Sequence, residues 1–108
     1  MDYEERLNEM LQKHYDDMNS VGLAELILFG SGIDRFVENE RRVTLLLNHI
    51  VKICGYKTNA RDFANMISYD DFKKRRGVSE IAALGLKLYL FYACGVDWEH
   101  HRTINYSI

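Results

Sequence analysis

The stretch that decides the fold is residues 79–94, SEIAALGLKLYLFYAC, in which Lys87 is the one charged residue after Glu80. Ser79 suits the N-cap of a helix, and Gly95, directly after the stretch, suits its left-handed end. A helix that is apolar on all sides must be buried over most of its surface. We therefore expect the preceding helices to wrap it, or one of its faces to pack on a second copy. Wrapping is favoured because the two N-terminal helices supply matching apolar faces.

Two helices are predicted in the N-terminal part of the chain. In residues 2–18, apolar residues recur at steps of three and four, with charged residues mostly between them. This is the pattern of an amphipathic helix. Asn19-Ser20 can end it and cap a second, apolar helix, which we expect over Val21–Phe29. Gly30-Ser31-Gly32 then forms a flexible break.

Further helical segments are expected after this break. The first is one or two turns around Ile33, Phe36 and Val37, followed by a helix over Glu40–Cys54 that is capped by Asn39 and ended by Gly55. A short helix then starts at Thr58 or Asn59 and contains Phe63, Ala64 and Met66. The next helix runs from the capping box Ser68-x-x-Asp71 to Arg75 and is ended by Gly77. An irregular tail is expected from Trp98. Proline is absent and no strand pattern remains. The sequence therefore predicts an all-α, compact bundle of five to six short helices.

The composition fits one soluble domain over residues 1–108. Its 47% hydrophobic and 28% charged residues are typical of globular proteins. The longest apolar run, residues 81–96, is interrupted by Lys87 and is shorter than the ~20 residues that a bilayer needs. The charged start MDYEERLNEM does not look like a signal peptide. We therefore expect Cys54 and Cys94 to be reduced, buried thiols in a cytoplasmic protein.

Four successive cations precede the last helix, in Lys73-Lys74-Arg75-Arg76-Gly77-Val78-Ser79. Such a run commonly complements the negative end of a helix dipole and keeps a surface solvated. Here a glycine turn and a helix N-terminus follow it, and exposed N–H groups at a positive dipole end favour phosphate. The net charge of −2 argues against a protein that only coats nucleic acid, but it leaves room for a local basic patch.

The glycines and caps around this turn match a known pattern. The matching residues are Gly55-Tyr56-Lys57-Thr58, Phe63, Ser68-Tyr69-Asp70-Asp71-Phe72, Arg76-Gly77-Val78 and Gly95-Val96. Over about residues 39–96 the chain resembles the C-terminal domain of the bacterial RNA polymerase alpha subunit. The resemblance implies a helix-hairpin-helix-like part in residues 39–98, with residues 1–38 as an N-terminal helical extension. It also implies DNA as a ligand and the transcription machinery as a protein partner.

The sequence departs from that pattern at the turn itself. In the wider helix-hairpin-helix pattern, Gly-h-Gly-x-x-x-Ala, Gly77 matches the first glycine and Ala83 the alanine, but Ser79 replaces the second glycine. Glu80-Ile81-Ala82 stand where basic residues usually follow. No residue before Gly55 aligns with the family's DNA-contacting arginine, although Arg41 and Arg42 precede it on the same predicted helix. The predicted nucleic-acid-binding residues are Arg41, Arg42, Lys73, Lys74, Arg75, Arg76, Gly77 and Ser79.

No pattern typical of a metal, cofactor or catalytic site is recognised. The four histidines and two cysteines, His14, His49, His100, His101, Cys54 and Cys94, lack C-x-x-C or H-x-x-x-H spacing. His14 lies on an apolar stripe, which suits a core or interface histidine, whereas Glu99-His100-His101-Arg102 suits an exposed tail. There is no Gly-rich phosphate loop or nucleophile elbow. We therefore expect no cofactor and no enzymatic activity.

Two functions remain. The first is a small nucleic-acid-binding or transcription-associated module that contacts backbone phosphate through the basic turn. The second is a protein-interaction adaptor or phage-type regulator, with self-association through the Asp2–Met18 or Ser79–Cys94 helix as a special case. The acidic net charge, the missing second glycine and the surplus of apolar residues favour the second function. Nucleic-acid binding is slightly preferred because the turn offers a physical mechanism for it.

Overall fold

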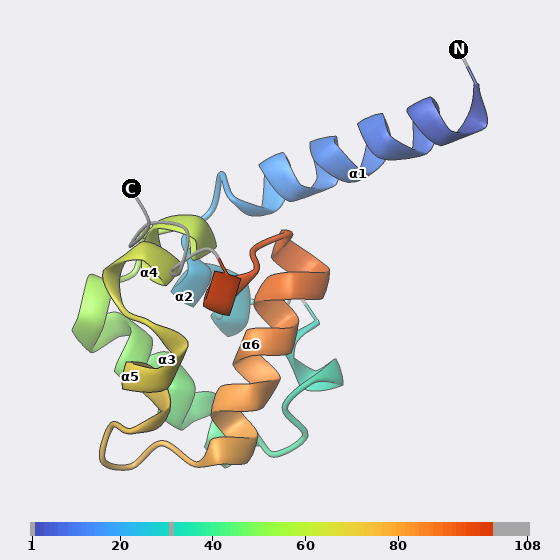
Figure 1. Ribbon diagram of the computed structural model, residues 1–108. Helices are drawn as coiled ribbons and strands as arrows, with labels where there is room; N and C mark the ends of the chain where they lie inside the picture. Colours follow the sequence, from blue (N-terminus) through green and yellow to red (C-terminus); the bar gives the residue numbers. More distant parts are fainter. Residues whose placement is uncertain (1, 31, 101–108) are drawn as a thin grey trace.

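The computed structural model describes residues 2–30 and 32–100, and within these residues the chain is helical with no strand. The elements are α1 (Tyr3–Met18), α2 (Leu23–Leu28), the 3₁₀ helix η1 (Ile33–Arg35), α3 (Glu40–Cys54), α4 (Ala60–Met66), α5 (Tyr69–Lys73) and α6 (Glu80–Cys94). The predicted all-α fold is confirmed. Helices α2 to α6 gather into one body, from which α1 projects (Figure 1).

Most helices begin at the capping residues that the sequence predicts. The side chain of each cap accepts a hydrogen bond from a backbone N–H in the first turn of its helix, which satisfies one of the N–H groups that have no intrahelical acceptor. The predicted caps are Asn39, Asn59, Ser68 and Ser79, and Asp2, which was expected inside the first helix, caps α1 in the same way. Gly95, with φ of +68°, ends α6 in the left-handed conformation. These predicted boundaries are confirmed because caps and glycines act locally.

Helix α2 is an exception, since it begins at Leu23 rather than at Val21. Its N-cap is Gly22, which has no side chain to offer. The Gly22 backbone lies against the α3–α4 connection so closely that a Cβ there would stand 2.1 Å from the carbonyl oxygen of Tyr56. The N–H of Leu23 donates to the carbonyl of Thr58 at 2.8 Å. A contact distant in sequence therefore sets the start of α2.

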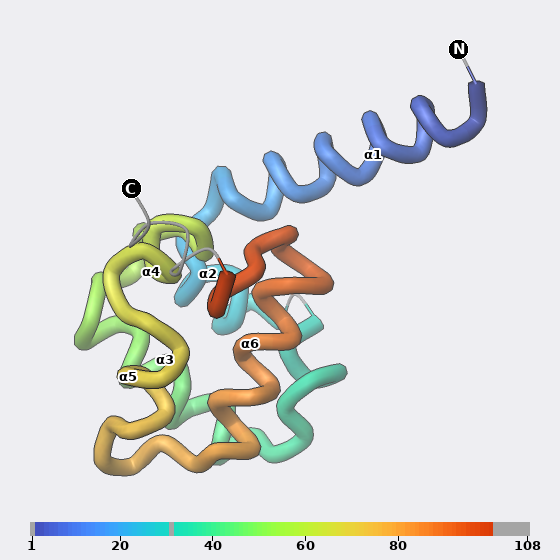
Figure 2. Tube along the Cα trace, in the orientation of Figure 1, coloured from blue at the N-terminus to red at the C-terminus, as the bar shows by residue number. Residues whose placement is uncertain are grey.

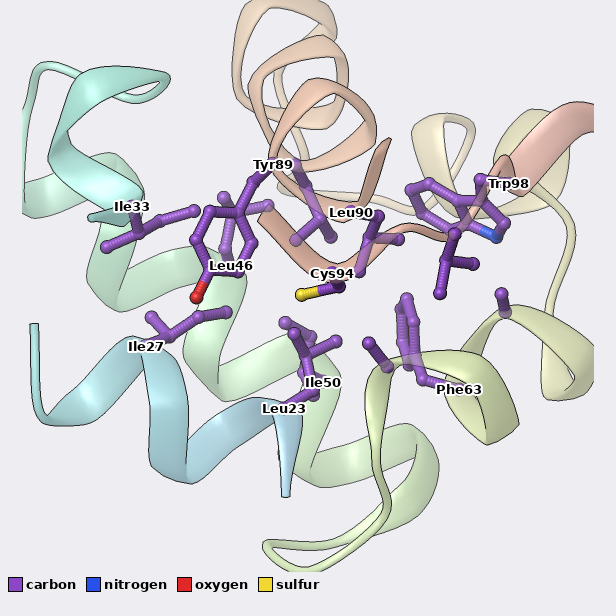
Figure 3. Packing of buried hydrophobic residues seen from close by; sticks show 14 of the residues in the cluster. Leu23, Ile27, Ile33, Leu46, Ile50, Phe63, Tyr89, Leu90, Cys94 and Trp98 are labelled. Carbon is purple, nitrogen blue, oxygen red and sulfur yellow. The ribbon is translucent and has the colours of Figure 1, made fainter. Parts of the chain in front are cut away.

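The core forms where one face of α6 meets α2 and α3. Tyr89, Leu90 and Cys94 of α6 face the buried side chains of these two helices, as Figure 3 shows. Those side chains are Leu23 and Ile27 of α2 and Leu46 and Ile50 of α3. At Gly85, α6 approaches the segment after η1, and a Cβ there would lie 2.5 Å from the carbonyl oxygen of Phe36. Glycine is required at this crossing.

Trp98 belongs to the core, and the prediction that an irregular tail begins there is wrong. Its side chain is fully buried, its Nε1 donates to the carbonyl of Ile67 at 2.9 Å, and its ring centroid lies 5.3 Å from those of Phe63 and Tyr69. Residues 98–100 are helical. An isolated aromatic residue has no periodicity, so the pattern could not show this packing. Glu99 and His100 are exposed as expected, whereas His101 and Arg102 lie outside the described residues.

Helix α1 does not wrap α6, so the predicted wrapping is wrong for this helix. None of its residues is buried, and its N-terminal half points away from the body (Figure 2). It contacts α6 at its C-terminal end, where the ring of Tyr15 lies so close to Gly95 that a Cβ on that glycine would be 2.6 Å away. As a result, α6 keeps large apolar side chains in solvent on the face opposite the core.

Both cysteines are free thiols. Cys94 is fully buried, and that burial raises its pKa to about 12. Cys54 is half-buried, and its thiol donates to the carbonyl of Ile50 at 3.2 Å. Burial also raises the pKa of Cys54, against a smaller opposing effect of its hydrogen bond with Thr58.

Asn19 joins α1 to the body. It is the one buried polar side chain among the described residues. Its Nδ2 donates to the carbonyls of Tyr15 and Cys94, both at 2.9 Å, and its Oδ1 accepts from the N–H of Arg61 at 3.2 Å. One amide therefore connects the end of α1, the end of α6 and the start of α4.

We expect Asn19→Ala to lower the free energy of unfolding by about 2–3 kcal/mol, because it removes three hydrogen bonds and leaves the buried carbonyl of Cys94 without this donor. Asn8→Ala, on the exposed part of α1, is the matched control and should change stability by less than about 0.5 kcal/mol. Urea denaturation followed by circular dichroism measures both values. Equal midpoints for the two variants would contradict the role of Asn19.

Candidate nucleic-acid interface

The predicted interface centres on residues 74–79, which connect α5 to α6. The N–H of Val78 donates to the carbonyl of Arg75 at 3.1 Å and closes a tight turn. Gly77 has φ of +93° in this turn, a conformation that side-chain-bearing residues rarely adopt. The hydroxyl of Ser79 then accepts from the N–H of Ala82 at 3.1 Å. Ser79, which stands where the hairpin pattern has glycine, therefore caps its own helix.

His49 of α3 positions the first arginine of the turn. Nε of Arg75 donates to Nδ1 of His49 at 3.2 Å, and the imidazole lies edge-on to the ring of Phe72 at 6.2 Å. A Cβ on Gly77 would lie 3.4 Å from Nε2 of His49. Burial, followed by the charges of Arg75 and Lys52, lowers the pKa of His49 below its usual value of 6.5. His49 is therefore neutral near pH 7 and can accept this hydrogen bond.

Arg42 of α3 lies beside the same turn. A small pocket is lined by Arg42 and His49 from α3, by Gly77, Val78 and Ser79 from the turn, and by Leu45, Leu46 and Ala82. Its free volume of about 10 Å³ would hold at most one water molecule. Because a base or sugar is too large to enter, contact with a large ligand is limited to the rim of this pocket.

Lys73 faces a different side of α6 from Arg75. Its Nζ lies 3.2 Å from a carboxylate oxygen of Asp70 and 5.1 Å from the ring centroid of Tyr69. The hydrogen bond to Asp70 is the main reason why the pKa of Lys73 is raised. Lys73 also lines a hollow with Glu80, Ile81 and Leu84. The structure thus separates Lys73 from Arg42 and Arg75, although it adjoins the other cations in sequence.

The three remaining predicted cations, Arg41, Lys74 and Arg76, are exposed. None of them forms an ion pair with another residue of the described chain. Their charges are therefore available to an external ligand. Arg41 and Arg42 are adjacent at the start of α3, while Lys74 and Arg76 flank Arg75 in the turn.

The sequence pattern raised His49 only as a possible metal ligand, a role that its spacing did not support, and did not identify its contact with Arg75. Residues 42, 45, 46 and 49 share one face of α3 by helical spacing. The imidazole of His49 on this otherwise mainly apolar face was the one sign in the sequence that the face meets a polar partner. Which element this face meets depends on tertiary packing, so the partner could not be read from the pattern.

The negative net charge comes from residues 2–18, which are α1 and its N-cap Asp2, and not from the part that contains the basic turn. Residues 2–18 contain six acidic and two basic side chains, a net charge of −4. Residues 19–100 contain ten acidic and eleven basic side chains, a net charge of +1. The overall acidity is therefore weaker evidence against a basic interface than the total suggests.

Comparisons with known proteins add no family or function. No family pattern, characterised protein or solved structure matches this chain. The resemblance to the C-terminal domain of the RNA polymerase alpha subunit stays a prediction. In residues 2–30 and 32–100, no cluster of three or more histidine, cysteine or acidic side chains is placed to hold a metal. Nor does this part of the chain contain a helix long and apolar enough to cross a membrane.

We expect the pKa of His49 to lie below 6.5, and Arg75→Ala to raise it while leaving it below that value, because burial is the larger cause. NMR titration of the imidazole measures both. Arg76→Ala is the control and should leave the titration unchanged. Because unfolded chains take up this proton more readily, His49 should also contribute a loss of stability as the pH falls below 6.5. An unaltered pKa in Arg75→Ala would contradict the contact.

Proposed function

We propose that the protein binds the phosphate backbone of nucleic acid at the rim formed by the start of α3 and the α5–α6 turn. The observation that supports this proposal best is the pocket that Arg42 shares with Gly77 and Ser79. Two segments far apart in sequence thereby bring cations to the same place. Such convergence suits a polyanion better than a set of scattered surface charges.

Arg75 is the most strongly positioned cation of the rim. Its Nε is engaged by His49, which restrains the side chain and leaves the terminal guanidinium nitrogens free to donate. Two parallel donors on a planar group suit a phosphate. Arg41, Arg42, Lys74 and Arg76 would add contacts around it.

The N-terminus of α6 would contribute less to this binding than in the helix-hairpin-helix pattern. The hydroxyl of Ser79 already occupies the N–H of Ala82, and the carboxylate of Glu80 sits in the first turn of the helix. Both features reduce the attraction of this helix end for phosphate. We therefore assign most of the binding free energy to the side-chain cations, which give sequence-independent, salt-sensitive affinity.

We expect a dissociation constant on the order of 10⁻⁴–10⁻⁶ M for duplex DNA at physiological salt, the range of non-specific binding. In the triple variant Arg42→Ala/Lys74→Ala/Arg76→Ala, the slope of log K against log salt should fall by about 2–3, since each phosphate contact contributes about 0.9. Fluorescence anisotropy of a labelled duplex at several salt concentrations measures both quantities.

The matched control is Arg6→Ala/Lys13→Ala/Lys57→Ala, which removes three exposed charges elsewhere. It should keep the slope. An equal loss in both triple variants, or no binding at tens of micromolar protein in low salt, would refute the proposed interface.

Ser79→Gly tests the contribution of the helix end separately. It removes the hydroxyl that caps Ala82 and restores the glycine of the hairpin pattern. If phosphate reaches the N–H groups of α6, affinity should rise by about 2- to 10-fold, the value of one hydrogen bond, while stability falls by only a few tenths of a kcal/mol. Weaker or unchanged binding in the same anisotropy assay would leave the contact to the side-chain cations alone.

A further inference from the structure

Helix α1 presents an apolar stripe that has no partner within the described chain. We define the arm stripe as Tyr3, Leu7, Met10 and Leu11, whose side chains are 40–77% exposed. Isolated helices of about 15 residues are marginal in water unless an amphipathic face is packed. The arm stripe therefore indicates that α1 packs on another surface.

A second exposed stripe lies on α6, opposite the core. We define the α6 stripe as Ile81, Leu84, Leu88 and Phe91, which are 36–62% exposed and recur at steps of three, four and three. These steps place all four side chains on one face of the helix. Scattered exposed apolar residues are ordinary, but a contiguous stripe of this kind marks an interaction surface.

The two stripes match in form. At 1.5 Å per residue, the arm stripe extends about 12 Å and the α6 stripe about 15 Å. In each stripe the apolar side chains recur at steps of three and four residues, the spacing with which one helix packs its apolar face against another. The arm cannot fold back onto α6 of its own chain, because Tyr15 and Asn19 fix its base against the end of α6 and its N-terminal half points outward. The match can therefore be made only between two molecules.

Charge favours contact between the arm and the body over contact between two arms. The arm, residues 2–18, has a net charge of −4, whereas residues 19–100 have a net charge of +1. Two arms would repel each other, while one arm and the body of another copy attract. Two lysines lie beside the α6 stripe, but each is paired within its own chain, Lys87 with Glu99 at 3.0 Å and Lys73 with Asp70 at 3.2 Å. The attraction therefore rests on the net charges of the arm and the body.

We propose that two copies of this chain associate by reciprocal docking, in which the arm stripe of each copy covers the α6 stripe of the other. This contact goes beyond the proposed phosphate binding and does not depend on it. Each copy contributes eight large apolar side chains in the two stripes. This is fewer than the ~20–30 residues that each side of a standard interface supplies. We therefore expect a dimer of modest affinity, with a dissociation constant on the order of micromolar.

Sedimentation equilibrium of the full chain tests the association. The expected mass rises with concentration from 12.7 kDa towards twice that value. Leu84→Glu should raise the dimer dissociation constant at least about tenfold, since it buries a charge in the apolar contact. Leu7→Glu, on the exposed arm, should do the same without disturbing the core. Met66→Glu, at an exposed position of α4, is the control and should leave the constant unchanged. A mass of one chain at several hundred micromolar would overturn the proposal.

Disulfide trapping tests which surfaces meet. One version carries Leu7→Cys, the other carries Leu88→Cys, and both carry Cys54→Ser. Mild oxidation of the mixture should give mainly the mixed disulfide-linked dimer, which contains one chain of each version. Disulfide-linked dimers of a single version should be minor products. A Leu7–Leu7 or Leu88–Leu88 product in excess would overturn the reciprocal arrangement. Titration of DNA with the Leu7→Glu variant separates this proposal from the proposed phosphate binding. We expect this variant to be monomeric and to bind DNA as the unaltered chain does, because the two surfaces are separate.

Discussion

The side-chain amide of Asn19 is the interaction on which the arrangement of the helices depends. It lies where α1 ends, and its three hydrogen bonds reach Tyr15 of α1, the end of α6 and the start of α4. Without it, the buried carbonyl of Cys94 and the part-buried N–H of Arg61 would lose this partner. The same amide holds the base of the arm against Gly95, so the direction in which α1 leaves the body follows from it.

Local chemistry made much of the fold predictable. The start of α3 at Glu40 and of α6 at Glu80 follows from Asn39 and Ser79, whose side chains act within three residues along the chain. The end of α6 is likewise determined locally, since Gly95 readily adopts the positive φ that ends the helix. Asn19 ends α1 as predicted, but its bridge to α6 and α4 was not predictable, and neither were the roles of Trp98 and Gly22. Each of these contacts joins residues more than thirty positions apart. Hydrophobic periodicity indicates which face is apolar but not what covers it.

Helices α1 and α3 show this limit most clearly. Both are amphipathic and both were predicted with nearly correct ends, yet α3 buries Leu46 and Ile50 whereas α1 buries nothing within its own chain. The difference lies in the surroundings, since α2 and α6 both pack on α3, whereas α1 meets α6 near its C-terminal end, where Tyr15 lies against Gly95. An apolar stripe without an intramolecular partner is consistent with an intermolecular one.

The candidate site shows the same division between local and distant determinants. Four adjacent cations were visible in the sequence, but only the fold shows that Lys73 is drawn to Asp70 while Arg75 is held by His49. The fold also places Arg42 beside the turn. Ser79 serves two incompatible needs there, because the hydroxyl that stabilises the start of α6 takes up an N–H that an anion would use. The Ser79 cap stabilises the start of α6 and leaves one N–H fewer for an anion at this helix end. The proposed phosphate contact is therefore assigned mainly to the arginines and lysines at the rim.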